Sequence, residues 1–118
     1  MIMQGEIWEV EFFSNIGSEI GKKRPAIVVS YDTVGKLPLK TVVPITEWSN
    51  SYTHYPWMIK LINDKLNGLS KPSAIDCFQI RNFSDTRFGV KLGEVDNTLL
   101  LNIHQVIAKT LNPKYRLV

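Results

Sequence analysis

The chain consists of short apolar runs closed by turn signals, followed by a single run with helical spacing. Six segments have the length and composition of β-strands: residues 6–13, 25–31, 40–46, 57–62, 73–81 and 89–94. In the first of them Trp8, Val10 and Phe12 share one face and acidic residues share the other, which is the period of a half-buried strand. Short strands of this kind cannot cover their own apolar faces, so the pattern predicts a small, strongly curved β-structure.

In two of these segments, the sequence also indicates where the strand lies in the sheet. The unbroken apolar run in residues 25–31 is typical of a strand that is covered on both sides. Pro44 interrupts residues 40–46 and has no N–H to donate, which predicts an edge position or a bulge. The connections at residues 32–38, 47–56, 63–68 and 82–87 are polar or rich in turn residues and are predicted to be loops and turns.

The last third of the chain differs in kind. Asp96 is a good N-cap, and apolar residues then recur at helical spacing: Leu99, Leu100, Ile103, Val106, Ile107 and Leu111. Asn112 and Pro113 are expected to end this helix. At 118 residues the chain is expected to form a single domain over residues 1–118, a small β-barrel with one helix packed against it.

Composition narrows the class of protein. The chain is 44% hydrophobic and 21% charged, and its longest apolar runs fall far short of the ~20 residues that cross a bilayer. The acidic N-terminal residues do not resemble a secretion signal, so we expect a cytoplasmic protein with no membrane partner. A single cysteine, Cys77, permits no internal disulfide, and no residue grouping has metal-ligand spacing, so no metal or other cofactor is expected.

One segment suggests a functional site. Residues 17–30 form a glycine-bracketed loop, then three consecutive cations (Lys22, Lys23 and Arg24), then Pro25 and an apolar strand. Proline pushes the preceding residue towards an extended conformation, so Arg24 would be held at the mouth of a buried strand. A planar, permanently charged guanidinium suits phosphate, and the net charge of +3 is compatible with a nucleic-acid partner. The alternative is a solvated cationic turn with a structural proline.

Five strings together resemble the MazF/PemK/Kid toxins of bacterial toxin–antitoxin systems: GEIWEVEF, GSEIGKKRPAIVVS, TVVPIT, NGLSKPSAIDCFQIR and KLGEVD. The resemblance spans nearly the whole chain, in order. It implies an SH3-like barrel and a homodimer. It also implies a metal-independent endoribonuclease, an mRNA interferase, that cuts single-stranded RNA at short sequences and is neutralised by a cognate antitoxin.

The resemblance also assigns residues. Arg24 matches the arginine regarded as catalytic in the family, and Thr46 matches its Thr or Ser partner. Glu19 and Gln79 match positions near the RNA-binding groove. By charge alone, Lys22, Lys23 and Arg81 would add affinity for phosphates. Without the resemblance, Thr46 would be an ordinary strand-end residue. Arg81 could equally be a partner in a structural ion pair.

The chain departs from the family pattern in two places. The family's loop usually continues with Gln and Gly after GSE, where this chain has Ile20 and Gly21. Many members carry an acid before the motif's Gln, where this chain has Phe78. If residues 73–81 form one strand, Asp76 lies on the same face as Phe78 and could replace that acid.

The roles of several other side chains remain open. Aromatic residues follow Thr46 and could stack RNA bases, or could equally be core or dimer contacts: Trp48, Tyr52, Tyr55 and Trp57. His54 could act as a general base, but an exposed loop histidine is the simpler interpretation. His104 is expected to have a surface or interface role.

The chemistry expected of Arg24 is stabilisation of charge on the phosphate while the 2′-hydroxyl attacks it. Two other functions remain open. CcdB-type toxins share this barrel and poison DNA gyrase without cutting nucleic acid, and a barrel that had lost catalysis would only bind RNA or protein. An acidic antitoxin tail would be attracted to the cations at residues 22–24 and would compete there with RNA.

Overall fold

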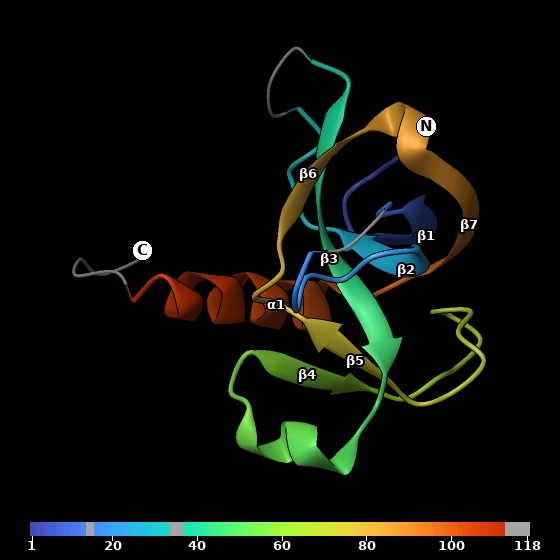
Figure 1. The fold of residues 1–118 in the computed structure, drawn as a ribbon. Coiled ribbons are helices and arrows are strands. Elements are labelled where there is room, and N and C mark those ends of the chain that lie inside the picture. The colour runs from blue at the N-terminus through green and yellow to red at the C-terminus, as the bar shows by residue number, and fades with distance from the viewer. Residues whose placement is uncertain (14–15, 34–36, 113–118) are drawn as a thin grey trace.

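The computed structural model describes residues 1–13, 16–33 and 37–112. Seven strands, two short 3₁₀ helices and one α-helix occur in these ranges (Figure 1). In chain order they are β1 (Glu6–Glu11), β2 (Lys23–Val28), β3 (Leu39–Glu47), η1 (Asn50–His54), β4 (Met58–Leu61), β5 (Ser73–Asp76), β6 (Arg81–Ser84), η2 (Asp85–Arg87), β7 (Phe88–Glu94) and α1 (Asn97–Thr110).

The strands form one antiparallel sheet with β3 at its centre. The hydrogen-bonded order is β4-β5-β3-β2-β1-β7, and β6 also pairs with β3. β3 is the longest strand at nine residues, and it crosses the whole molecule in Figure 1. The described sheet is strongly bent but does not pair its ends to close. The prediction of a mainly β, barrel-like fold with a C-terminal helix is confirmed.

The predicted single strand over residues 73–81 is wrong. β5 ends at Asp76, the chain turns, and a separate strand, β6, begins at Arg81. The cause is local: Asp76 Oδ1 accepts hydrogen bonds from the backbone N–H groups of Phe78 and Gln79, at 3.1 and 3.3 Å, and so folds the chain back on itself. Asp76 is therefore buried while Phe78 is 62% exposed, and the two do not share a strand face.

The prediction of a turn over residues 82–87 is wrong for its first half, because β6 runs to Ser84 before η2 begins.

Pro44 is not on an edge strand, because β3 is flanked on both sides. It lies instead where one flank of β3 changes partner, from β6 at residues 39–42 to β5 at residues 45–47. A residue with no N–H is tolerated there because the neighbouring chain is turning between β5 and β6.

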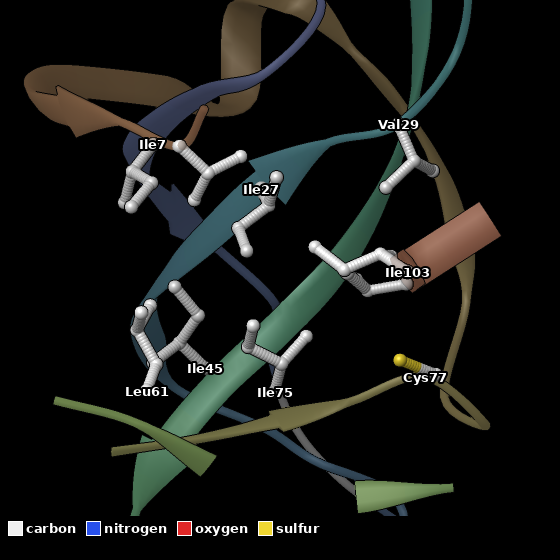
Figure 2. Packing of buried hydrophobic residues seen from close by; sticks show 10 residues of the cluster. Ile7, Ile27, Val29, Ile45, Leu61, Ile75, Cys77 and Ile103 are labelled. Atoms are coloured by element: carbon white, nitrogen blue, oxygen red, sulfur yellow. The ribbon is translucent and has the colours of Figure 1, made fainter. Parts of the chain in front are cut away.

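Two apolar clusters form the core. The larger one joins β1, β2, β3 and β5 to the helix through Ile7, Ile27, Ile45, Ile75 and Ile103, all at most 2% exposed (Figure 2). The smaller one consists of Val10, Phe12, Ala26, Val28 and Val42. The two sides of β2 thus contribute to different clusters, which confirms that this strand is covered on both faces.

Cys77 belongs to the larger cluster and has no exposed surface (Figure 2). Burial raises the pKa of its thiol to about 12, and the adjacent Asp76 carboxylate adds to the rise. Cys77 is therefore a small core residue.

The helix begins as predicted. Asp96 is the N-cap, and its Oδ1 accepts a hydrogen bond of 2.8 Å from Leu99 N–H. Ile103 is fully buried, while Leu111 follows the last helical turn and is 76% exposed. Pro113, part of the predicted stop signal, lies outside the described residues, as do residues 34–36 of the predicted turn at 32–38. α1 is neither long nor apolar enough to cross a membrane.

A buried carboxylate fastens β1 to β7. Glu6 is 9% exposed; its Oε1 accepts hydrogen bonds from Met3 N–H and Trp8 Nε1, at 2.7 and 3.1 Å. Its Oε2 lies 2.7 Å from Lys91 Nζ. Burial acts to raise the pKa of Glu6, but the hydrogen bonds from Lys91, Met3 and Trp8 outweigh burial and leave the pKa below its usual value of 4.5.

We predict that Glu6→Ala lowers the free energy of unfolding by about 1.5–3 kcal/mol at pH 7, since it removes a buried charged acceptor. A lowered carboxyl pKa stabilises the folded state above the unfolded value of 4.5. The difference between parent and variant should therefore shrink as pH falls below that value. Urea unfolding from pH 7 to pH 3 measures this. Glu9→Ala, which removes a partly exposed carboxylate 3.6 Å from Lys23, is the control and should change stability by no more than about 0.5 kcal/mol.

Candidate active site

Strand register brings Arg24 and Thr46 together. β2 and β3 pair Ala26 with Pro44, and continuing this antiparallel register by two residues sets Arg24 opposite Thr46. Arg24 Nη1 donates to Thr46 Oγ1 at 3.4 Å, a long hydrogen bond. Arg24 Nε donates to the carbonyl oxygen of Gly21 at 3.1 Å. The guanidinium is thus held at two points and keeps further N–H groups available.

These residues line a pocket of about 440 Å³, which we call the Arg24 pocket. Lys23, Lys71, Ser70 and Ser73 also line it. The one carboxylate in the lining, Glu47, lies 3.3 Å from Lys71 Nζ. The pocket therefore combines three cations with one acid, the balance that suits a phosphate group. Lys71 was not among the residues predicted from sequence, although it stands in the NGLSKPS string.

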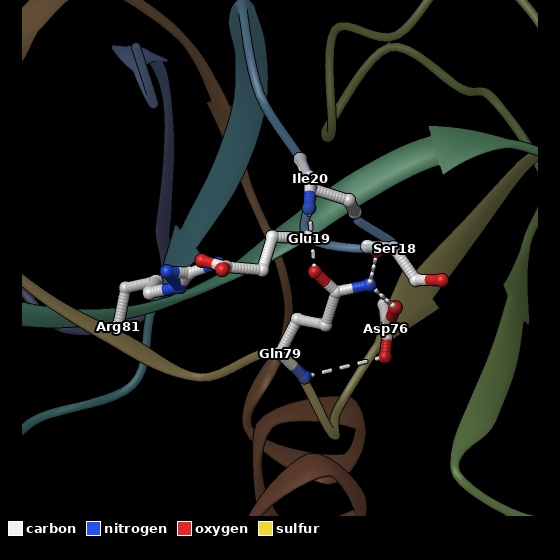
Figure 3. Close-up of polar contacts among 6 residues, drawn as sticks. All are labelled: Ser18, Glu19, Ile20, Asp76, Gln79 and Arg81. Carbon is white, nitrogen blue, oxygen red and sulfur yellow. Dashed lines mark hydrogen bonds and ion pairs between the residues drawn. The ribbon is translucent and has the colours of Figure 1, made fainter. Parts of the chain in front are cut away.

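Glu19, Gln79 and Arg81, which were also predicted, lie in a second site, which we call the Gln79 cluster. Its members are Ser18, Glu19, Ile20, Asp76, Gln79 and Arg81 (Figure 3). Gln79 Oε1 accepts from Ile20 N–H at 2.7 Å, and Gln79 Nε2 donates to Asp76 Oδ2 at 3.0 Å and to Ser18 O at 3.4 Å. Arg81 Nη2 lies 3.2 Å from Glu19 Oε2.

The loop over residues 16–21 connects the two sites. Its backbone binds Gln79 through Ile20 and binds Arg24 through Gly21. Of the predicted RNA-binding residues, Glu19 and Arg81 pair with each other, while Gln79 binds Ser18, Ile20 and Asp76. An RNA chain that binds here must replace these contacts.

The remaining two predicted residues occupy other positions. Lys23 lines the Arg24 pocket and also lies 3.6 Å from Glu9. Lys22 is exposed, has a φ of 65°, and pairs its backbone with Phe12 and Phe13. Lys22 does not line the Arg24 pocket, so in the described ranges its side chain is a neighbour of the site rather than part of it.

The aromatic residues after Thr46 form a continuous series on η1 and its flanks, which we call the aromatic series. Trp48 contacts Tyr52, Tyr52 contacts Tyr55, and Tyr55 stacks on Trp57 with ring centres 5.0 Å apart and planes 5° from parallel. The series continues to Phe78, 6.0 Å from Trp57. These rings lie outside both core clusters. Phe78 was missed as a member, although an aromatic residue before the motif's glutamine was visible in the sequence.

Neither histidine lies in these sites. His54 ends η1 and is exposed, as expected of a loop histidine. His104 Nε2 lies 2.8 Å from Val29 O and ties α1 to the end of β2. In residues 1–13, 16–33 and 37–112, no group of three or more His, Cys, Asp or Glu side chains is placed to hold a metal ion.

Known proteins resemble this chain in sequence and in fold. The model of the family described as PemK-like, MazF-like toxin of type II toxin-antitoxin system matches residues 3–111. Endoribonuclease MazF9 of Mycobacterium tuberculosis is 31% identical over 113 residues, which is 91% of this chain and 93% of the relative.

Two solved structures show the same fold. MazF from Deinococcus radiodurans superposes with a TM-score of 0.77 at 22% identity, covering 95% of this chain and 97% of that one. An endoribonuclease from a mycobacterial species, solved in complex with its cognate antitoxin, has a TM-score of 0.72 at 15% identity. That match covers 98% of this chain and 100% of the mycobacterial one.

We predict that Asp76→Ala lowers the free energy of unfolding by about 1–3 kcal/mol, because Phe78 N–H and Gln79 N–H lose a buried acceptor. Urea unfolding followed by tryptophan fluorescence gives the value. Glu47→Ala is the matched control, since that carboxylate is exposed and pairs only across the surface with Lys71. Equal stability of the two variants would contradict a structural role for Asp76.

Proposed function

The chain belongs to the PemK-like, MazF-like family of type II toxins, and we propose that it is an endoribonuclease that cleaves single-stranded RNA at short sequences without a metal ion. The observation that carries the proposal is the placement of Arg24 against Thr46 in a pocket lined by cations. The 31% identical relative is an endoribonuclease by name.

The reaction is a transesterification. The 2′-oxygen attacks the adjacent phosphorus, the bond from phosphorus to the 5′-oxygen breaks, and a 2′,3′-cyclic phosphate remains on the upstream fragment. The 2′-hydroxyl gives up its proton, and the leaving 5′-oxygen gains one. Negative charge accumulates on the non-bridging oxygens as the phosphorane forms, so this charge is what the site must stabilise.

Arg24 is assigned to that charge. A guanidinium offers parallel N–H donors to two oxygens, and one preorganised donor of this kind is commonly worth about 2.7–4 kcal/mol of transition-state stabilisation. Arginine stays protonated to above pH ~12, which favours electrostatic stabilisation over proton transfer. Thr46, whose hydroxyl already contacts Arg24, orients the 2′-hydroxyl or a phosphate oxygen.

RNA on either side of the scissile bond would follow charges and rings that the fold exposes. Lys23 and Lys71 line the Arg24 pocket, and Lys22 adds charge beside it. The aromatic series offers unpaired bases surfaces on which to stack. Glu19, Gln79 and Arg81 provide polar contacts once RNA replaces the Glu19–Arg81 pair and the bond from Ile20 N–H to Gln79.

The same proposal includes partners and location. The toxin would act as a homodimer in the cytoplasm and would be neutralised by a cognate antitoxin. An acidic segment of that antitoxin would be attracted to Lys22, Lys23 and Arg24 and would exclude RNA from the pocket. A mycobacterial protein of the same fold has been solved in complex with its cognate antitoxin.

The test uses a long single-stranded RNA incubated in EDTA with the parent protein or with Arg24→Ala. The parent should make discrete cuts that leave cyclic phosphates, and the variant should cut at least about 100-fold more slowly. Arg87→Ala is the matched arginine control, because that guanidinium lies over the rings of Phe13 and Phe83, 4.2 and 4.6 Å away, and should leave the rate unchanged.

A folded parent protein that makes no cuts would contradict the proposal and favour a gyrase poison or an inactive RNA- or protein-binding barrel. If Arg24→Ala makes the same cuts as fast as the parent does, that result would contradict the assignment of Arg24.

We also predict that the Thr46 hydroxyl matters more than its methyl group. Thr46→Val keeps the shape but removes the contact to Arg24, and should lower kcat by about 10- to 100-fold. Thr46→Ser keeps the hydroxyl and should stay within a few-fold of the parent. Single-turnover cleavage of a short RNA gives both values, and equal rates for the two variants would contradict a role for the hydroxyl.

A further inference from the structure

Asp76 is a buried carboxylate whose side-chain hydrogen bonds all lead to the turn that carries Gln79. Only 2% of the residue is exposed. Its Oδ1 binds the backbone N–H groups of Phe78 and Gln79, and its Oδ2 accepts from Gln79 Nε2 at 3.0 Å (Figure 3). Backbone and side chain of the same glutamine are thus tied to one acid.

This arrangement determines which way the Gln79 amide faces. A carboxylate offers acceptors, so the Gln79 NH₂ group must face Asp76 and the Gln79 carbonyl must face away from it. In the opposite orientation, the Gln79 oxygen would meet the Asp76 oxygen and the Gln79 NH₂ would meet Ile20 N–H. Both pairings are repulsive, so the amide has one favourable direction.

Gln79 lines a groove of about 590 Å³, and its carbonyl oxygen accepts a hydrogen bond from a backbone donor of the loop at residues 16–21. At present that donor is Ile20 N–H, 2.7 Å away. Trp57 and Phe78 line the same groove, together with Arg81. A base that stacks on one of these rings therefore shares the groove with the Gln79 amide, and an N–H of that base can take the place of Ile20 N–H.

We infer that Asp76 is a positioning residue that holds the Gln79 side chain as a hydrogen-bond acceptor for one RNA base, and so helps to set which base is accepted beside the cleavage site. The inference rests on the proposed ribonuclease activity. Asp76 touches no RNA in this account and acts only through Gln79.

An acceptor divides the four bases into two classes. Opposite the exocyclic group at position 6 of a purine or position 4 of a pyrimidine, it favours adenine and cytosine, which carry an amino group there, over guanine and uracil, which carry oxygen there. Opposite the ring nitrogen of the Watson–Crick edge, it favours guanine and uracil, which carry N–H, over adenine and cytosine. In either case one class is preferred, and a donor in the same place would prefer the other.

Asp76→Asn tests this with little change of shape. The oxygen of the introduced amide can still accept from the backbone N–H groups of Phe78 and Gln79, but the NH₂ of that amide replaces the oxygen that faced Gln79. Once RNA has displaced Ile20 N–H, the Gln79 amide should turn round and present its NH₂ to the base. We expect the parent's preference between the two base classes at one site position to be lost or exchanged, a change of about tenfold or more in relative kcat/KM.

The measurement is deep sequencing of cut ends from a randomised RNA, followed by kcat/KM on short RNAs that differ at the affected position. Gln79→Leu removes the amide and should abolish the same preference without exchanging it. The double variant Asp76→Asn/Gln79→Leu should match Gln79→Leu in base preference, because Asp76 acts only through Gln79. Preferences at the other positions should persist in all three variants.

Two outcomes would overturn this inference while leaving the proposed function intact. One is that Asp76→Asn, or Gln79→Leu, cuts with the parent's base preference. The other is that the double variant differs in preference from Gln79→Leu. A parent protein that cuts no RNA would instead overturn the proposed function and this inference together. If Asp76→Asn does not fold, Gln79→Leu alone still decides whether the amide selects a base.

Discussion

The pairing of β2 with β3 is the constraint on which the rest of the structure depends. The same register that aligns Ile27 with Val43 in the core sets Arg24 opposite Thr46 at the end of the strands. Because strand residues alternate between faces, a one-residue slip would exchange the residues that face the two core clusters and would separate the two site residues. Burial of apolar surface therefore stabilises the geometry of the pocket as well as the fold.

β3 extends this constraint to the second site. Its other flank pairs with β6 and with β5, and the turn between those strands carries Gln79. The Arg24 pocket spans β3 from Arg24 in β2 to Ser73 in β5, whereas the Gln79 cluster is built on the turn that follows β5. The loop at residues 16–21 joins the two sites, because its Gly21 binds Arg24 and its Ile20 binds Gln79.

Much of the fold could be predicted from the sequence because the signals were local. The alternation at Trp8, Val10 and Phe12, the apolar run after Pro25 and the Asp96 cap each depend on neighbouring residues. Pro44 and Asp76 were misinterpreted because their effect depends on partners that the local pattern does not reveal. Pro44 is tolerated where the flank of β3 changes partner, and Asp76 ends β5 by binding the turn that follows. Of the site, the sequence indicated Arg24 and Thr46, but not Lys71 or the mutual pairing of Glu19 with Arg81.

The central claim is that the Arg24 pocket receives the scissile phosphate. The most direct test is a crystal structure of the protein with its target RNA carrying a single 2′-deoxy substitution at the scissile nucleotide, which prevents cleavage. We expect the scissile phosphate to lie within hydrogen-bond distance of the Arg24 guanidinium, with the 2′-position beside Thr46. A neighbouring base should lie in the groove that Gln79 lines. A target RNA bound elsewhere on the protein, with Arg24 still paired only to Gly21 and Thr46, would contradict this claim.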